Sequence, residues 1–135
     1  MRIFQLCALA LIATFSGCAI VNPQADHAAL GESQWKLMSI GETPVNLGES
    51  ATLKFDEKES KISGVAACNS FSGGYEMIRK AITFEQLVTT KKYCEGKMDE
   101  ENQIITGLQS VTRYDVKANM LYFYNKGQLV LTYRR

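Results

Sequence analysis

Along most of the chain, hydrophobic and polar residues alternate in short segments bounded by turn-forming residues. The pattern is clearest where Ala51, Leu53 and Phe55 alternate with polar neighbours, which is the period of a half-buried β-strand. Similar segments predict strands over residues 34–40, 51–55, 61–66, 71–77, 81–84, 114–116, 120–124 and 128–133. Turn-forming or charged residues connect several of these segments, at positions 41–44, 56–59 and 125–127.

One segment, residues 95–111, has the period of an amphipathic helix instead. Its hydrophobic stripe consists of Met98, Ile105, Leu108 and Val111, with Ile104 beside it. The rest of its surface carries Glu100, Glu101, Asn102 and Gln109. Acidic residues in the first turns suit the positive end of the helix dipole, whereas Gly107 costs about 1 kcal/mol relative to alanine.

These elements predict a single α+β domain that is mainly β. We expect a small curled antiparallel sheet or a lipocalin-like barrel of about six to eight short strands, packed against one helix. The length of 135 residues leaves room for one compact domain. Its 46% hydrophobic and 21% charged residues are typical of a folded, globular protein.

The charge balance limits the partners that the chain can bind. Lys and Arg number 15 against 14 Asp and Glu, for a net charge of +1, which argues against a nucleic-acid-binding surface. A single histidine argues against His-dependent catalysis and multi-histidine metal sites. The motifs of serine hydrolases, nucleotide-binding loops and zinc proteases do not occur in the sequence.

The N-terminal residues resemble an export signal. Arg2 precedes an apolar run over residues 6–15, followed by small residues, and this run is shorter than the roughly 20 apolar residues of a membrane span. Residues 16–18, Ser-Gly-Cys, resemble the lipobox of bacterial lipoproteins, except that Phe15 replaces the usual leucine. We predict a lipoprotein signal peptide over residues 1–17 and acylation, including palmitate, of Cys18. Ordinary signal cleavage is the alternative.

A lipid at Cys18 would anchor the protein in the bacterial cell envelope without a membrane span. Ala19 follows the cysteine, and the resemblance to enterobacterial lipoproteins then implies the outer membrane, with the domain facing the periplasm. Residues 18–33 have no sustained periodicity and are predicted to form a lipidated tether, followed by the domain over residues 34–135.

Cys68 and Cys94 are the cysteines that remain free to pair, because Cys7 would be removed with the signal peptide and Cys18 would be acylated. Export to an oxidising compartment favours a disulfide between them, which would contribute about 3.5 kcal/mol by closing a loop of about 26 residues. Two buried free thiols are the alternative. A zinc site would need further ligands, and His27 lies alone in the predicted tether, so we predict no metal and no other cofactor.

Three motifs resemble the META domain of HslJ-like proteins, also described as the DUF306 type. They are residues 62–64 (Ile-Ser-Gly), 68–75 (Cys-Asn-Ser-Phe-Ser-Gly-Gly-Tyr) and 89–94 (Thr-Thr-Lys-Lys-Tyr-Cys). An early helical glutamate, Glu100 or Glu101, continues the pattern. Ala67 replaces the family's usual glycine and Lys92 its usual methionine. The residues that carry the resemblance, besides the cysteines, are Gly64, Asn69, Phe71, Gly73, Tyr75 and Thr90.

Elementary chemistry gives these motif residues structural roles. Asn69 suits a turn, and glycines permit close backbone approach, positive φ or a bulge. Phe71 and Tyr75 lie on one face of a strand, which favours the core over a ligand-binding platform. Thr90 is expected near the end of a strand or in a loop.

The resemblance implies an envelope protein associated with stress and antibiotic tolerance, without enzymatic activity. We therefore expect a non-enzymatic lipoprotein that binds an envelope protein partner or a hydrophobic ligand. The alternatives are a lipoprotein that resembles secretin pilots and a small lipid-binding module. An open apolar cleft between sheet and helix would favour a binding module of this kind, and a filled core would argue against it.

Overall fold

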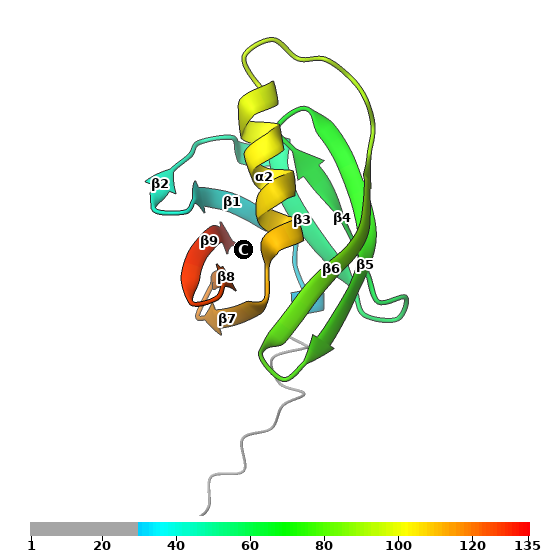
Figure 1. Cartoon of the computed structure of the whole chain (residues 1–135), viewed down its shortest axis with the longest axis vertical. Helices are drawn as coiled ribbons and strands as arrows, with labels where there is room; N and C mark the ends of the chain where they lie inside the picture. The colour runs from blue at the N-terminus through cyan, green and yellow to red at the C-terminus, as the bar shows by residue number, and fades with distance from the viewer. Residues whose placement is uncertain (1–29) are drawn as a thin grey trace, which may run out of the picture.

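The structure, a computed structural model, describes residues 30–135. The predicted signal peptide (1–17), Cys18 and most of the predicted tether therefore lie outside the described residues. The described chain forms one antiparallel sheet and one long helix (Figure 1). The strands are β1 (Trp35–Ile40), β2 (Thr43–Pro44), β3 (Ala51–Asp56), β4 (Lys61–Ala66), β5 (Asn69–Ile78), β6 (Ala81–Thr89), β7 (Arg113–Lys117), β8 (Met120–Asn125) and β9 (Gln128–Arg134). The helix is α2 (Met98–Ser110), and a short 3-10 helix, η1 (Gly48–Ser50), precedes β3.

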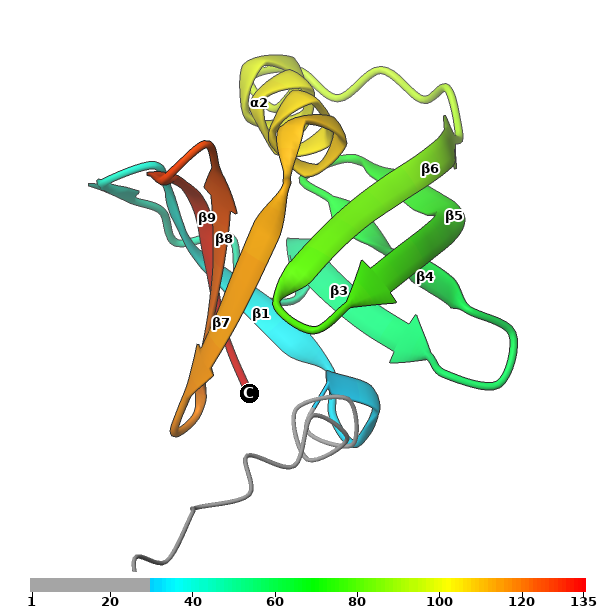
Figure 2. The same cartoon turned by 60° about the horizontal axis from the view of Figure 1, so that its bottom comes forward.

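The sheet closes on itself to form a barrel. Its strands are ordered β2-β1-β3-β4-β5-β6-β7-β8-β9, and β1 also pairs with β9. The contact between β6 and β7 is short, with the single register pair Ala81↔Arg113. α2, which connects these two strands in sequence, lies across one end of the barrel (Figure 2). The prediction of a curled, mainly β fold with one helix is confirmed.

Two strand predictions need correction. Residues 43–44, expected in a turn, form the short strand β2 against the end of β1, so the sheet has nine strands. β6 continues to Thr89 instead of ending at Phe84. Gln86 has φ +51° at a point where the register between β5 and β6 shifts. This bulge interrupts the alternation of hydrophobic residues, which is why the pattern ended early.

Aromatic rings fill the middle of the barrel. The Phe55 and Tyr75 ring centroids lie 5.4 Å apart, and Phe84 and Phe123 are separated by the same distance. Tyr133 extends this row at 6.0 Å from Phe123. These are edge-to-face distances typical of packed protein interiors. The prediction that Tyr75 belongs to the core is confirmed, and the same holds for Phe71, which is 3% exposed.

The folded core begins before the predicted boundary at residue 34. Leu30 is 1% exposed, and its carbonyl accepts a hydrogen bond of 3.0 Å from the indole nitrogen of Trp35, which is fully buried. The predicted tether over residues 18–33 therefore includes at least one residue of the core. Leu30 belongs to no periodic hydrophobic pattern in the sequence, so nothing there predicted this contact.

α2 is shorter than predicted, and its buried face is rotated relative to the predicted hydrophobic stripe. Its buried residues are Glu101, Ile104, Gly107 and Leu108, so Ile104 lies at the centre of the buried face and Ile105 at its margin. A Cβ atom on Gly107 would lie 3.2 Å from side-chain atoms of Leu131 and Val130. The glycine thus lets the helix approach β9 closely, which offsets its low helix propensity.

Candidate functional site

Asn69, the first residue of β5, connects the barrel to the loop over residues 90–97, which precedes α2. Its side chain is almost completely buried. The amide oxygen accepts hydrogen bonds from the Lys92 backbone N–H and the Thr90 hydroxyl, both at 2.7 Å. The amide nitrogen donates to the Lys92 carbonyl at 2.9 Å. Asn69 thereby pairs with the loop much as a strand backbone would.

Glu101 in α2 completes this network from the other side. Its carboxylate accepts hydrogen bonds from the Asn69 backbone N–H at 2.7 Å and from the Asn69 amide nitrogen at 2.8 Å. The side chain is buried, so the expectation that Glu101 belongs to the polar surface of the helix is wrong. A buried carboxylate is tolerated when charge-assisted hydrogen bonds replace its hydration, and Asn69 supplies them.

A disulfide between Cys68 and Cys94 lies beside this network, as the sequence analysis expected. The bond joins the residue before Asn69 to the same loop, with the two Cα atoms 5.9 Å apart. We call the set Cys68, Asn69, Thr90, Cys94 and Glu101 the Asn69 clasp. The clasp fixes the loop and the start of α2 against the β4–β5 turn.

Ala67 lies in the β4–β5 turn next to the clasp and has a left-handed backbone, with φ +63°. This conformation costs an L-residue with a side chain about 1–2 kcal/mol, and glycine adopts it freely. The backbone N–H of Ala67 nevertheless donates to the Ser50 carbonyl at 2.7 Å, which holds the turn in place. The usual glycine of the resembling family therefore suits this position, and alanine is strained there.

The motif glycines act through strand packing. A Cβ atom on Gly64 would collide with the backbone oxygen of Thr52 on β3. A Cβ atom on Gly73 would lie 2.7 Å from the backbone oxygen of Glu85 on β6, closer than van der Waals contact. Neither glycine has a positive φ. Both are needed because the neighbouring strands approach closely.

The structure also accommodates the second departure from the family pattern, which is Lys92 in place of the usual methionine. The Lys92 side chain is exposed, and its backbone makes the contacts with Asn69. A lysine is therefore compatible with the clasp at this position. Thr90, expected at a strand end or in a loop, is the first residue after β6, and its hydroxyl also accepts a hydrogen bond of 3.2 Å from the Ser70 N–H.

The loop held by the clasp borders an open groove of about 510 Å³ between the β1–β2 hairpin and the start of α2. Its lining includes the hydrophobic side chains Ile40, Val45, Tyr93 and Met98 and the acidic side chains Asp99 and Glu100. Tyr93 is 79% exposed although it is a large aromatic residue. A second hollow of about 390 Å³ shares Ile40 and Gln103 with the groove and continues along α2. No pattern in the sequence predicted this groove.

Two tyrosines of the described chain have raised pKa values. Burial raises the pKa of the Tyr133 phenol well above its ordinary value. Burial also raises the pKa of Tyr75, with smaller contributions from the charges of Glu57 and Asp56. Within residues 30–135, no group of three or more His, Cys, Asp or Glu side chains is placed to hold a metal ion. None of the helices in this range has the length and hydrophobicity needed to cross a membrane.

The fold and the clasp define a small, closed antiparallel barrel with one helix at its end and a disulfide-bonded loop. The family model of the META domain matches residues 28–135, and the chain belongs to this family. The match begins before residue 30, in agreement with the buried position of Leu30. A search of curated proteins found no match.

Solved structures share the fold. A protein studied by NMR is 28% identical, with a TM-score of 0.63 over 85% of this chain and 95% of its own. A protein from Burkholderia xenovorans, also studied by NMR, is 20% identical, with a TM-score of 0.66 over 84% of this chain and 88% of its own. A DUF4847 family protein from Bacteroides vulgatus is 10% identical, with a TM-score of 0.64 over 81% of this chain and 96% of its own.

Proposed function

We propose that this META domain protein is a lipid-anchored protein of the bacterial envelope that acts by binding a protein partner and not by catalysis. The groove beside Tyr93 is the proposed binding site. The observation that carries the proposal is the Asn69 clasp, because its disulfide and the hydrogen bonds between Asn69 and Lys92 hold the loop that borders this groove. The hydrogen bonds between Asn69 and Glu101 hold the start of α2 on the other side of that loop.

A fixed loop favours binding because its conformational entropy has already been lost on folding. The loop over residues 90–97 has no regular secondary structure, yet the clasp secures it at Lys92 and at Cys94. Between these two points Tyr93 projects into solvent. An exposed aromatic side chain on a rigid support is the kind of residue that dominates binding energy at protein interfaces.

The composition of the groove indicates what the partner carries. Ile40, Val45 and Met98 offer an apolar floor, and the carboxylates of Asp99 and Glu100 lie at its side. A segment with an apolar side chain next to a lysine or arginine complements both features. The cation would also be attracted to the face of the Tyr93 ring.

The filled interior argues against the alternative of a hydrophobic-ligand carrier. The row of rings from Phe55 to Tyr133 occupies the space that an acyl chain would need inside the barrel. A pilot-like role remains compatible with a surface groove, because a pilot binds a segment of its partner. The identity of the partner separates this alternative from other envelope functions.

Site-specific crosslinking tests the groove. We expect the photoreactive amino acid p-benzoylphenylalanine at position 93 to crosslink a partner in intact cells. The matched control is the same amino acid at Val88, which is 63% exposed on β6 and lies outside the groove. Identical products from the two positions, or no product from position 93, would contradict the proposal. Capture of a secretin at position 93 would instead support the pilot-like alternative.

The anchor and the biological role need separate measurements. A fatty-acid analogue should label the wild type and leave the Cys18→Ala variant unlabelled, and membrane fractionation should place the labelled protein in the outer membrane. Label retained in Cys18→Ala would contradict the anchor. Cells that carry Tyr93→Ala should lose tolerance of envelope stress or of antibiotic to the same extent as cells that lack the protein, if the groove carries the function.

A further inference from the structure

The end of the barrel away from α2 brings both ends of the described chain together (Figure 2). The β5–β6 and β7–β8 turns lie on this side as well. Backbone hydrogen bonds connect the segments at this end. The Arg135 N–H donates to the Asn119 carbonyl at 3.1 Å, and the Tyr114 N–H donates to the Lys80 carbonyl at 3.0 Å. Leu30, where the described chain begins, packs on Trp35 at the start of β1.

Basic side chains gather on this surface. Its exposed cations are Arg79, Lys117 and Arg134, flanked by the half-buried Lys80 and Arg135. We call these five residues the cationic end. The Asp115 carboxylate lies 3.5 Å from the Lys80 ammonium group and 3.6 Å from that of Lys117.

An apolar side chain accompanies these cations. Ile78, at the end of β5 and next to Arg79 in the chain, is 76% exposed. Cations beside an exposed aliphatic side chain are the composition of surfaces that contact membrane headgroups.

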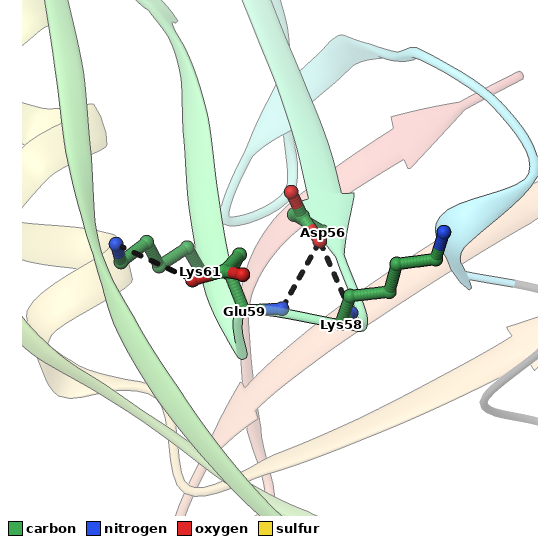
Figure 3. Close-up of polar contacts among 4 residues, drawn as sticks. All are labelled: Asp56, Lys58, Glu59 and Lys61. Atoms are coloured by element: carbon green, nitrogen blue, oxygen red, sulfur yellow. Dashed lines mark hydrogen bonds and ion pairs between the residues drawn. The ribbon is translucent and has the colours of Figure 1, made fainter.

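The excess of positive charge does not extend to the β3–β4 hairpin. There the Asp56 carboxylate accepts hydrogen bonds from the backbone N–H groups of Lys58 and Glu59, at 3.0 and 3.1 Å (Figure 3). Lys61 lies 3.9 Å from the Glu59 carboxylate. Residues 56–61 carry three acidic and two basic side chains, so this turn is slightly acidic. A Cβ atom on Gly31 would lie 2.8 Å from the Glu57 carboxylate, so this hairpin adjoins the start of the described chain.

We propose that the cationic end binds the anionic headgroups of the membrane in which the protein is anchored. The orientation rests on the proposed lipid at Cys18, because a tether of about twelve residues reaches at most about 40 Å and joins the domain at Leu30. The tether therefore holds this end of the barrel nearest the bilayer, and the groove beside Tyr93 points away from it. Each cation near an anionic surface strengthens binding about fivefold.

Binding to vesicles tests this surface without the anchor. The full chain with Cys18→Ser, isolated without its signal peptide, is sedimented with vesicles of phosphatidylcholine alone or mixed with phosphatidylglycerol. We expect binding to the mixed vesicles that is much weaker with phosphatidylcholine alone and is lost in high salt. The triple variant Arg79→Gln, Lys117→Gln, Arg134→Gln should bind the mixed vesicles about a hundredfold more weakly.

The control variant removes the same number of charges from the exposed loop before α2, at the opposite end of the barrel, by Lys91→Gln, Lys92→Gln and Lys97→Gln, and should stay within about twofold of the parent. Equal losses in both triple variants, or parental binding in the first, would overturn the proposal. The single variant Lys117→Gln, expected to lose about fivefold, serves if a triple variant unfolds. The acyl group on Cys18 and the protein partner are both absent from this measurement, so its failure leaves the proposed anchor and groove to their own tests.

Discussion

Asn69 and Glu101 are 32 positions apart in the chain, and they meet in the interior through hydrogen bonds of 2.7 to 3.0 Å. The asparagine lies at the start of a strand and the glutamate in the first turn of the helix. Their contact fixes how α2 docks on the barrel, and it does so with polar groups inside a mainly apolar core.

Removing the asparagine should therefore cost more than one hydrogen bond. In Asn69→Ala the Glu101 carboxylate stays buried without its amide partner, and the Lys92 backbone loses its two contacts. We expect a loss of about 3 kcal/mol in the free energy of unfolding, measured by urea denaturation. Asn119→Ala, in an exposed turn, is the control and should change stability by less than about 0.5 kcal/mol. A loss below about 1 kcal/mol in Asn69→Ala would contradict the role of the clasp.

Ala67→Gly should stabilise the protein. The left-handed backbone at position 67 strains alanine, and glycine relieves this strain at a smaller cost in unfolded-state entropy. We expect a gain of up to about 1 kcal/mol in thermal or chemical denaturation. Ala66→Gly is the matched control: it lies in β4, and there glycine should destabilise. If both substitutions changed the free energy of unfolding in the same direction, the left-handed φ at Ala67 would not be the reason for the effect of glycine there.

Gly64→Ala should be strongly destabilising. The added methyl group would collide with the Thr52 backbone oxygen, so β3 and β4 would have to separate, at a cost of about 3 kcal/mol or more. Gly74→Ala is the comparison, because its Cβ would lie no closer than 3.9 Å to its neighbours. Similar melting temperatures for the two variants would exclude close strand approach as the reason for Gly64.

Loss of the disulfide should loosen the loop beside the groove. The double variant Cys68→Ser, Cys94→Ser opens a loop of 26 residues and should lose about 2–4 kcal/mol of stability. Amide hydrogen exchange should rise most over residues 90–97, because the bond secures this loop. An increase spread evenly over the barrel would show that the bond stabilises the whole fold without fixing this loop in particular.

Stability should fall at alkaline pH. Burial raises the pKa of Tyr133 above its ordinary 10.0, so the folded state keeps a proton that the unfolded state releases. Its contribution is complete below pH 10.0 and declines as the pH rises above that value. Urea denaturation between pH 8 and 11 should show a shallower decline in Tyr133→Phe. Tyr93→Phe, which alters an exposed phenol, should leave the decline unchanged.

The sequence predicted the elements whose period is regular. Alternation in β3 and β8 predicted their positions, because each of these strands turns mainly one face to the core. The second half of β6 was missed because the bulge at Gln86 breaks that period. Leu30 was assigned to the tether since no neighbour shares its pattern.

Glu101 shows why the site was harder to predict than the fold. Acidic residues at the start of a helix are typical of the surface, and Glu100 and Asp99 fit that expectation. A usable signal was present, however: Glu101 precedes Ile104 by three positions and Leu108 by seven, the spacing of one helix face. A charged residue on that face requires a buried partner, and the asparagine beside Cys68 was a candidate.

The pairing of β1 with β9 gives the last strand of the fold a particular importance during synthesis. A nascent chain that has emerged only as far as β8 leaves one edge of β1 and one edge of β8 without neighbours. Such edges recruit strands from other molecules. Premature termination near residue 127 should thus produce an aggregating fragment and not a smaller stable domain. The C-terminal strand Gln128–Arg134 is the element that closes the barrel and covers both edges.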